Sequence, residues 1–411
     1  MRRRLARRSA RGTSKSGLFL LVAAVVLVDT MFFAAVAPLL PHYSDELDLS
    51  KTGAGVLTAA YPAGTFAGAV PAGLLAARWG VKPTLLTGLA LLGVTSLVFA
   101  FAGNIVLLDS ARFVQGLGGA CMWAAGMAWL VSAAPADRRG ELIGSALAAA
   151  IVGVLLGPVL GGAATVVGPE VVFSGVSLVA VGLAAWTWRI PGVPPEPSPG
   201  VRWLLRALRR RELLIGFWLF ALPALFTGVV EVLAPLRLDD LGASGAAIGA
   251  VFLVTAAVEA ALSPVVGRLS DRRGRLAPIR AGLAGAAVMA ILLPLPGSAL
   301  LLGATIVVAF FALGAFWAPA MALLSDASED AGLDMALAFS ISNLAWALGH
   351  VVGSGAGGAI ADATADAVPY AILAALSAVT LAGVISLGRR ATGRSPMDSS
   401  ATASCRCAGR A

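Results

Sequence analysis

Charged residues, histidine and cysteine are all scarce in this sequence. Only 13% of its 411 residues are charged and only two are histidines, whereas a soluble domain carries roughly 25% charged residues. Two histidines cannot build a metal cluster. The three cysteines lack the neighbouring ligands of a metal site and the number needed for a disulfide framework. We therefore expect free thiols at Cys121, Cys405 and Cys407, no metal and no other cofactor.

Signatures of enzymes and of secreted proteins are missing as well. The apolar segments contain no His-Glu-x-x-His pair and no Ser-His-Asp set that can be placed, and no soluble domain is appended to them. The amino-terminal stretch MRRRLARRSARGTSK is basic, but the small-residue cleavage site of a secretory signal does not follow it. These absences predict that the chain is not an enzyme and keeps its first apolar segment.

Long apolar runs are what the sequence has instead. Residues of hydrophobic type make up 58% of the chain, and runs of about 20 residues recur, each long enough to cross a hydrocarbon core of about 30 Å as a helix. The pattern predicts an all-α membrane protein. We place twelve spans at residues 17–40, 52–76, 83–103, 107–132, 142–167, 170–190, 212–236, 244–266, 278–295, 298–324, 333–361 and 366–387.

The basic residues provide a test of this count. If the amino terminus is cytoplasmic, 27 of the 30 basic residues fall in segments on the inner side, and only Lys51, Arg112 and Arg237 fall elsewhere. The positive-inside rule thus supports twelve spans with both termini cytoplasmic. We expect a multi-pass protein of the plasma (inner) membrane. One inner loop, SDASEDAGLD at residues 325–334, is acidic and departs from the pattern.

Three short stretches recur at a nearly constant offset. Ala37–Leu39 returns as Ala234–Leu236 after 197 residues, Gly73 matches Gly267 after 194, and Gly153 matches Gly349 after 196. Such repeats are a common plan for transporters. They predict a basic cytoplasmic tail (1–16), an amino-terminal six-helix bundle (17–190), a cytoplasmic linker (191–211), a carboxy-terminal six-helix bundle (212–388) and a cytoplasmic tail (389–411).

The linker begins with a proline-rich stretch, which favours an extended chain. The basic stretch that follows, VRWLLRALRRR, has interleaved apolar residues. It either lies flat on the inner headgroups or forms a plain charged helix; both interpretations stay open. We expect contacts with membrane lipids, no binding to nucleic acid, and a monomer.

Asp29 lies about 11 residues into the first predicted span, close to mid-membrane depth at about 1.5 Å per residue. A charge there costs at least about 2.5 kcal/mol. An acid in this place is either a proton site or is locked to a structural partner such as Arg112. Arg112 itself needs a partner because it is hard to neutralise. We expect it to tune a carboxyl proton, and we expect Asp109, three residues earlier, to pair with it on the helix surface.

Each of the other polar residues of the spans has two possible interpretations. Glu259 is a second proton site or packs against polar neighbours, and Glu231 lines an outer vestibule or reaches the interface. His350 follows Gly349 in a glycine-rich contact face, which favours a helix-packing hydrogen bond over a proton relay. Tryptophans in the spans can stack on a cation, although lipid or core contacts are more common; these are Trp123, Trp129, Trp317 and Trp346.

At its loop motifs the chain resembles the major facilitator superfamily. The loop after the second span in that family has the pattern G-x-L-A-D-R-x-G-R-K. The first copy here, GLLAARWGVK, has Ala77 in place of the acid. The second copy, GRLSDRRGR, is fuller. The resemblance implies an inner gate in which acid and basic side chains pair and glycines allow tight turns. Its residues are Gly73, Arg78, Gly80, Lys82, Gly267, Asp271, Arg272, Gly274 and Arg275.

Two further elements narrow the resemblance. RFVQG in the fourth span is similar to the family's Arg-x-x-Gln-Gly element. GVLLGPVLGG in the fifth span is similar to the G-x-x-x-G-P-x-x-G-G element of its drug/proton antiporters. Glycines four residues apart give a bare face for close helix contact, and a proline frees a carbonyl. The matching residues of the fifth span are Gly153, Gly157, Pro158, Gly161 and Gly162.

The first span itself resembles that of the vesicular amine transporter branch and its bacterial multidrug relatives. The resemblance implies that Asp29 serves proton coupling and a cationic substrate, with Arg112, Glu231 and Glu259 as further candidates. We therefore predict a secondary transporter that exports small amphiphilic, cationic compounds in exchange for protons by alternating access. A proton-coupled uptake symporter is the alternative, and a receptor or membrane-embedded enzyme is the alternative of another class.

Overall fold

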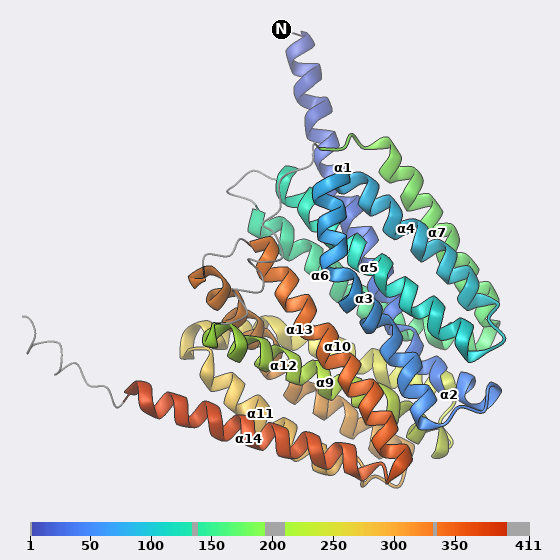
Figure 1. Cartoon of the computed structure of the whole chain (residues 1–411), viewed down its shortest axis with the longest axis vertical. Helices are drawn as coiled ribbons and strands as arrows, with labels where there is room; N and C mark the ends of the chain where they lie inside the picture. Colours follow the sequence, from blue (N-terminus) through green and yellow to red (C-terminus); the bar gives the residue numbers. More distant parts are fainter. Residues whose placement is uncertain (1, 134–138, 194–209, 332–334, 393–411) are drawn as a thin grey trace, which may run out of the picture.

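The computed structural model describes residues 2–133, 139–193, 210–331 and 335–392, and the regular structure of this part is helical throughout (Figure 1). The helices are α1 (Arg2–Ala34), α2 (Val36–Glu46), α3 (Lys51–Trp79), α4 (Val81–Ala100), α5 (Ile105–Ala133), α6 (Arg139–Val167), α7 (Pro169–Arg189), α9 (Arg211–Asp240), α10 (Gly245–Arg273), α11 (Leu276–Leu292), α12 (Ala299–Asp330), α13 (Met335–Ala363) and α14 (Ala367–Thr392).

Each of the twelve predicted spans coincides with one of these helices, the first with α1 and α2 together. Within the described residues, ten helical segments are long and apolar enough to cross a membrane. The other two are α11, which is apolar but has 17 residues, and α3, which carries prolines at Pro62 and Pro71. The prediction of an all-α, multi-pass membrane protein is confirmed. Most of the predicted linker and of the carboxy-terminal tail lies outside the described residues.

The helix boundaries repeat along the chain. The side chain of Ser50 accepts the Gly53 N–H at the start of α3, and Ser244 accepts the Ala247 N–H at the start of α10. Asn104 and Ser298 cap α5 and α12 in the same way. Each pair of caps is 194 residues apart. A side-chain acceptor here satisfies an N–H that the helix itself cannot, so the two halves begin these helices alike.

The turns between helices follow the same spacing. Gly80, between α3 and α4, has a φ of 93°, and Gly274, between α10 and α11, has a φ of 79°. Both values lie in the region that only glycine adopts without strain. The glycines of the two loop motifs are therefore turn residues at equivalent places. Gly73, by contrast, lies inside α3 with open space beside it.

The glycine stripe of α6 packs against the backbone of α1. A Cβ atom on Gly153, Gly157 or Gly161 would collide with the carbonyl oxygens of Leu27, Met31 and Ala35, respectively. In the second half, Gly349 and Gly353 of α13 meet the carbonyl oxygens of Ala221 and Leu225 of α9 in the same manner, and Gly357 meets the side chain of Val229. The offset is 196 residues on one helix and 194 on the other, so both halves are built around the same glycine-mediated contact.

This register corrects one of the three predicted repeats. Equivalent positions on α1 and α9 are 194 residues apart on both sides of the Ala37–Leu39 stretch, so its structural counterpart begins at Glu231. The match of Ala37–Leu39 with Ala234–Leu236, at 197, is out of register by three residues.

Helices α1–α7 pack with one another, as do α9–α14, and the two groups meet through α3 with α13 and α6 with α10 (Figure 1). Small residues make these contacts close. A Cβ on Gly55 would lie 2.6 Å from the Ser354 carbonyl oxygen, and a Cβ on Gly249 would lie 2.9 Å from that of Pro158. Both contacts are near the end of the molecule where α3 and α10 begin.

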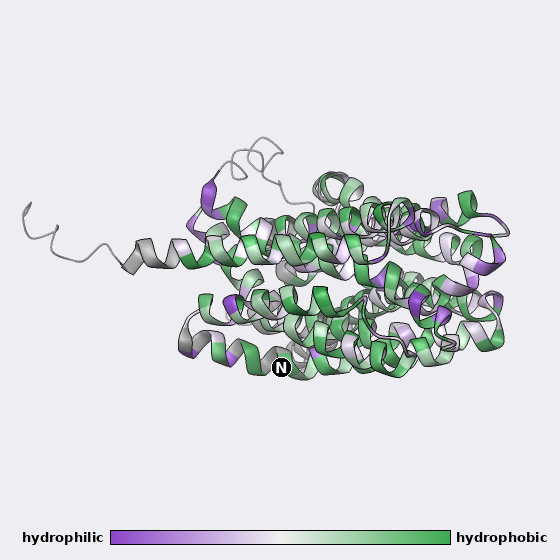
Figure 2. Ribbon diagram, turned by 90° about the horizontal axis from the view of Figure 1, so that it is seen from below, coloured by the Kyte–Doolittle hydropathy of each residue, from purple (hydrophilic) through white to green (hydrophobic). Residues whose placement is uncertain are grey.

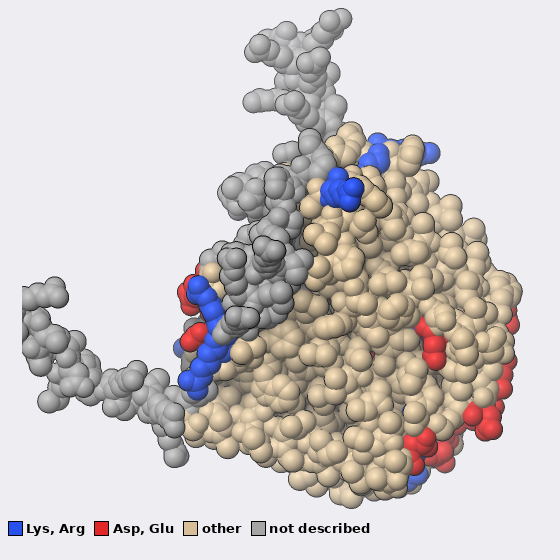
Figure 3. Space-filling view, in the orientation of Figure 1, with Lys and Arg blue, Asp and Glu red and all other residues tan. Residues whose placement is uncertain are grey.

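The two ends of the molecule differ in charge. Hydrophobic residues cover the helices along their length and hydrophilic residues concentrate toward their ends (Figure 2). Acidic side chains gather at one edge (Figure 3). We name this the acidic end; it is where α2, α9 and α13 finish and α3, α5 and α10 begin. Its acidic residues are Asp45, Glu46, Asp48, Glu170, Asp239, Asp240, Asp362 and Asp366.

The opposite, basic end holds nine basic residues whose side chains are described: Arg78, Lys82, Arg189, Arg210, Arg211, Arg268, Arg272, Arg275 and Arg280. The described part of the acidic stretch at residues 325–334, which departs from the positive-inside pattern, also lies at this end. Asp326 forms an ion pair with Arg275, and Arg210 donates to the backbone carbonyl of Asp330 at 3.3 Å. This loop is therefore matched to the basic residues around it.

A single added methyl group tests the glycine contact. In Gly157→Ala, the new Cβ would meet the Ala34 side chain and the Met31 carbonyl, so we expect a loss of about 1–3 kcal/mol of stability. Thermal unfolding of the purified protein in detergent measures it. Gly182→Ala is the matched control, because nothing lies within 4 Å of that site. An equal melting temperature for both variants would contradict the packing described here.

Candidate functional site

The Asp29 side chain is completely buried in the middle of the first half. Its Oδ2 atom accepts two hydrogen bonds, from the Tyr61 hydroxyl of α3 at 2.9 Å and from the Trp123 indole N–H of α5 at 3.1 Å. The Oδ1 atom makes no hydrogen bond with the described residues. Half of the carboxyl group is thus held by neutral donors and the other half is unpaired.

Space for this carboxyl group is provided by Gly119 of α5. A Cβ at this position would lie 2.6 Å from the Tyr61 hydroxyl and 3.2 Å from Asp29 Oδ1. Arg112, Gln115, Gly119 and Trp123 are spaced by three or four residues, which places them on one face of α5. The Arg-x-x-Gln-Gly element is therefore the beginning of a longer stripe that faces α1 and α3.

The Arg112 side chain is buried, and it forms no ion pair with a carboxylate of the described residues. Its Nη1 donates to Gln115 Oε1 at 2.8 Å and its Nη2 donates to the Phe33 carbonyl at 3.4 Å. Its guanidinium lies 5.1 Å from the centre of the Tyr61 ring, close enough for a cation–π interaction. Asp29 and Glu231 both lie within electrostatic range of it. Tyr61 therefore touches both the acid and the arginine.

Two expected pairs of Arg112 are not formed. The alternative in which Asp29 is locked to Arg112 is wrong for this structure, since no ion pair joins them in the part of the chain described. The predicted pair of Asp109 with Arg112 is wrong as well. Asp109 Oδ1 makes no hydrogen bond, and its side chain lines a groove beside α3 and α13 instead.

A second buried polar pair belongs to the other half. Nε2 of His350, on α13, lies 2.9 Å from Oε2 of Glu231, on α9. The His350 side chain is 1% exposed and that of Glu231 is 19% exposed. Nδ1 of His350 has no partner, so a proton on Nε2 allows the imidazole to donate to the carboxylate. His350 thus makes a hydrogen bond between α13 and α9, and its partner is one of the candidate proton sites. Helix packing and a proton relay both stay open as its role.

Phe33 connects the two pairs. Its ring contacts Tyr61 of the first half at 5.0 Å between centroids, and Trp346 and His350 of the second half at 5.3 and 5.5 Å. Beside it, a cavity of about 10 Å³ lies between Arg112 and Glu231, about the size that one water molecule requires. The structure thus brings three of the four candidates, Asp29, Arg112 and Glu231, into one region.

Glu259 lies apart from this group. Its side chain, on α10, is partly exposed and makes no hydrogen bond or ion pair with the described residues. The nearest feature is Gly314 of α12, where a Cβ would lie 3.4 Å from Glu259 Cγ. It is within electrostatic range of Glu231. Glu259 therefore has no direct polar partner among the described residues. Its two interpretations, a proton site and packing against polar neighbours, both stay open.

The basic residues of the loop motifs bind within their own halves. Lys82 donates to the Trp188 and Ile190 carbonyls at 2.7 and 2.9 Å, at the end of α7. Arg275 pairs with Asp326 and donates to the Ala322 carbonyl at 2.6 Å, at the end of α12. Arg78 and Arg272 are exposed. The Asp271 and Gly267 side-chain positions lie outside the described residues, so the predicted pairing across an inner gate is untested.

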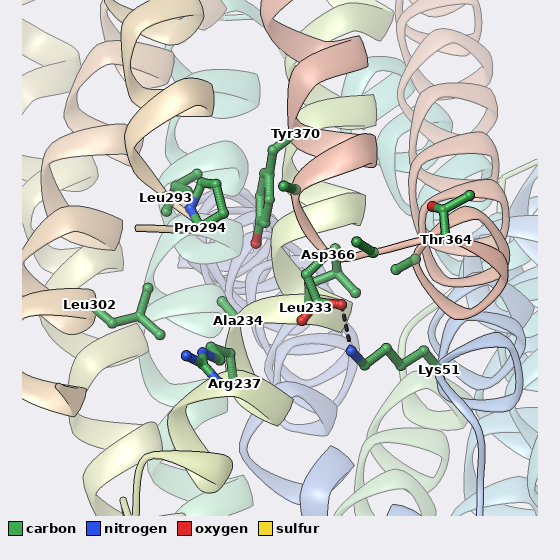
Figure 4. A pocket seen from close by; sticks show the side chains of 13 residues that line it. Lys51, Leu233, Ala234, Arg237, Leu293, Pro294, Leu302, Thr364, Asp366 and Tyr370 are labelled. Carbon is green, nitrogen blue, oxygen red and sulfur yellow. Dashed lines mark hydrogen bonds and ion pairs between the residues drawn. The ribbon is translucent and has the colours of Figure 1, made fainter. Parts of the chain in front are cut away.

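At the acidic end, side chains do join the halves. Lys51 of α3 forms an ion pair with Asp366, which precedes α14 (Figure 4). The Thr52 hydroxyl donates to Asp362 of α13 at 2.7 Å. A cavity of about 360 Å³, lined also by Arg237 and Tyr370, opens beside this ion pair. We call the two contacts the acidic-end latch.

Several residues of the site lie outside the sequence-based predictions. Tyr61 and Gly119 are not among the predicted site residues, and Trp123 is one of four tryptophans with the same expected role. The spacing of Trp123 and Gly119 from Arg112 on one helical face was the available signal. No sequence pattern pointed to Tyr61, because its position opposite Asp29 depends on the packing of α3 against α1 and α5.

The Major Facilitator Superfamily profile matches residues 22–237 and 224–404 of this chain. Among curated proteins, the fungal MFS-type transporter ppzB of Metarhizium rileyi is 35% identical over 147 residues, which cover 34% of this chain and 30% of that protein. The chloramphenicol resistance protein of Streptomyces lividans is 29% identical over 266 residues, covering 62% and 67%. The human synaptic vesicular amine transporter is 38% identical over 90 residues, covering 22% and 18%.

Solved structures share the fold over nearly the whole chain. A D-xylose–proton symporter has a TM-score of 0.69 at 19% identity, with 89% of this chain and 96% of the symporter covered. The nucleoside transporter NupG has a TM-score of 0.71 at 11% identity, covering 90% and 98%. The family profile shows that this chain belongs to the Major Facilitator Superfamily, a family of transporters and not of enzymes. The shared fold and the apolar helices agree with a multi-pass membrane protein, and the chain spans about a third of the length of the first curated relatives it matches.

Proposed function

We propose that this transporter exports small amphiphilic, cationic compounds in exchange for protons, and that proton and cation compete for Asp29. The observation that carries the proposal is the half-paired carboxyl group of Asp29. A buried carboxylate without a countercharge is unfavourable, and two neutral hydrogen bonds on one oxygen offset only part of that cost. Either a proton on Oδ1 or a cation beside it completes the site.

The surroundings of Asp29 suit an organic cation better than a metal ion. Both hydrogen-bond donors to Asp29 belong to aromatic side chains, Tyr61 and Trp123, and the Phe33 ring packs against Tyr61. Aromatic faces attract ammonium groups, whereas hard metal cations require several oxygen ligands. In the described residues, no group of three or more acidic, cysteine or histidine side chains that could hold a metal is present.

Arg112 has a positioning role in this proposal. Its charge lies behind the Tyr61 ring, so a cation entering at Asp29 is repelled unless Asp29 is ionised. Protonation of Asp29 removes the attraction and leaves the repulsion, which favours release. Phe33 then transmits a change at Tyr61 to Trp346 and His350, and Glu231 with His350 is a second place where a proton can be held. Glu259 is a further proton site in this scheme.

The energy source is the proton gradient. A tenfold pH difference supplies about 1.4 kcal/mol per proton, and a membrane potential supplies about 2.3 kcal/mol per charge per 100 mV. Two conformations that differ by a few kcal/mol respond to such energies. We propose that residues 17–190 and 212–388 rock as two units, with the acidic-end latch closed in the present state and the loop motifs forming the gate at the basic end.

The orientation follows from the charges. The basic end has nine arginines and lysines whose side chains are described, so we propose that it lies on the cytoplasmic side of a cell membrane. Both termini would then be cytoplasmic, as expected for a monomer anchored by lipid contacts of its basic segments. The state with a closed acidic end would accept cargo from the cytoplasmic side.

The direction of transport has one competing interpretation. Relatives named for chloramphenicol resistance and for vesicular amines favour removal of compounds from the cytoplasm, and so does the glycine-proline motif of α6. An uptake symporter would use the same fold. Substrate-induced proton influx in whole cells would favour the symporter, and proton release from everted vesicles favours the exporter.

The role of Asp29 is tested by Asp29→Asn in everted membrane vesicles. The amide keeps the shape of the side chain and cannot carry the charge, so proton release on addition of the cationic dye ethidium should fall by at least about tenfold, or 1.4 kcal/mol of coupling. Asp45→Asn, an exposed site at the acidic end, should behave as wild type. Undiminished proton release in Asp29→Asn, with wild-type protein levels, would refute the assignment.

A panel of substrates tests the charge preference. If Asp29 holds a cation, transport of ethidium should depend on Asp29 far more than transport of uncharged chloramphenicol does, because only the dye loses an ionic partner in Asp29→Asn. Flux of both compounds into the same vesicles provides the measurement. Equal losses would indicate that Asp29 carries protons alone, and the cationic substrate class would then be wrong.

Alternating access is tested at the latch. The Thr52 hydroxyl and the Asp362 carboxylate are 2.7 Å apart, so cysteines at both positions, in a chain whose own three cysteines are replaced by serine, should cross-link on oxidation. The cross-link should stop transport and a reductant should restore it, while each single cysteine variant remains active. Full transport by the cross-linked protein would show that the acidic end need not open.

A further inference from the structure

A groove where the two halves meet has features of a ligand site that is distinct from Asp29. It lies between α3, α5 and α13 and has a volume of about 530 Å³, within the range of sites for drug-sized molecules. Its surface is apolar, with Val56 and Phe113 exposed. The exception is Asp109, whose carboxylate is the single charge among the residues that line it.

Asp109 is an unusual residue for such a place. Its side chain is half-buried, and Oδ1 is shielded from solvent and makes no hydrogen bond with the described residues. Neither Arg112 nor any other described basic residue pairs with it. An unpaired carboxylate that is shielded from water by apolar surface is costly, because no partner offsets its lost hydration. The Asp109 carboxylate thus places a negative charge in the groove, and no described basic residue neutralises it.

The depth of the groove matches one leaflet of a bilayer. At 1.5 Å per residue, Asp109 lies about 6 Å below the start of α5, and Ala63 lies about 18 Å below the start of α3. The hydrocarbon half-thickness is about 15 Å. The charge is therefore near the headgroup level of the acidic end, and the apolar part of the groove runs from there toward the middle of the membrane.

We propose that this groove binds a monovalent amphiphilic cation from the leaflet at the acidic end, with its charged group at Asp109 and its apolar body along α3. Charge complementarity selects this occupant over a zwitterionic phospholipid, whose phosphate would bring a second negative charge close to Asp109. Small residues, Ala60 and Ala63 on α3 and Gly355 on α13, leave room for the apolar body. The choice of ligand class rests on the proposed function.

The groove is separate from the Asp29 site in the present state. Tyr61 and Thr58 of α3 face the buried centre, whereas Val56, Ala60 and Ala63 face the groove. The helix contact between Gly64 and Gly116 closes the space between α3 and α5, since each would clash with the opposite backbone if it carried a Cβ. A molecule in the groove therefore does not touch Asp29.

The experiment uses the full chain in lipid nanodiscs and two photoreactive probes of equal length, a dodecyl-trimethylammonium and its uncharged alkyl analogue. Mass spectrometry of the labelled peptides locates the attachment. We expect the cationic probe to label α3 near Ala60 and Ala63 about tenfold more than the neutral probe, which is the effect of one charge-assisted contact. Asp109→Asn should remove this preference and Asp109→Glu should retain it. Asp45→Asn, which removes an exposed charge at the acidic end outside the groove, is the control.

Several outcomes would overturn the proposal. Equal labelling by both probes in the wild-type chain would show a groove for lipid tails only. If the Asp109→Asn variant still preferred the cationic probe, a residue other than Asp109 would be responsible for the preference. Displacement of the probe by phosphatidylethanolamine, but not by tetraphenylphosphonium, would identify a lipid headgroup site. Labelling is measured without a proton gradient, and it is repeated in the Asp29→Asn variant. A failure of the proposed proton-coupled export would therefore leave the labelling result unaffected. A failure of the labelling experiment would likewise leave the export proposal unaffected.

Discussion

The Asp29 carboxylate accepts hydrogen bonds from Tyr61 and Trp123 on one oxygen, while its other oxygen is buried and unpaired. This arrangement constrains everything around it. Gly119 must lack a side chain, α3 must present its tyrosine, and α5 must present its tryptophan one turn beyond the glycine. Arg112 provides a charge near the site without neutralising it, since its hydrogen bonds go to Gln115 and Phe33.

The scaffold that holds this site is a repeat, but the site is not repeated. Caps, turn glycines and the glycine stripes recur at 194–196 residues, and they fix how helices begin, turn and pack. Pro223, Ile306 and Thr255 occupy the positions equivalent to Asp29, Arg112 and Tyr61. The second half carries its own polar pair, Glu231 with His350, at unrelated positions. A symmetric frame thus supports two different halves of one polar centre, joined by Phe33.

Much of the fold was predictable from the sequence because bilayer physics acts on each span separately. Length, apolarity and the distribution of arginine gave the helices, and the glycines gave their turns and contacts. The site was predictable only in part. Asp29, Arg112 and Glu231 are notable as single residues, whereas their partners depend on which faces of three helices meet. Asp109 illustrates the limit: spacing predicted a pair with Arg112, but a rotation of about 60° around the helix directs it to a different surface.

The central claim, that a proton and a cation exclude each other at Asp29, is tested most directly by counting protons. Purified protein in weakly buffered detergent is titrated with tetraphenylphosphonium near the pH at which Asp29 is protonated, and a pH indicator records the release. The account predicts about one proton released for each cation bound, and none for an uncharged analogue that binds. Saturable binding of the cation without proton release would contradict it.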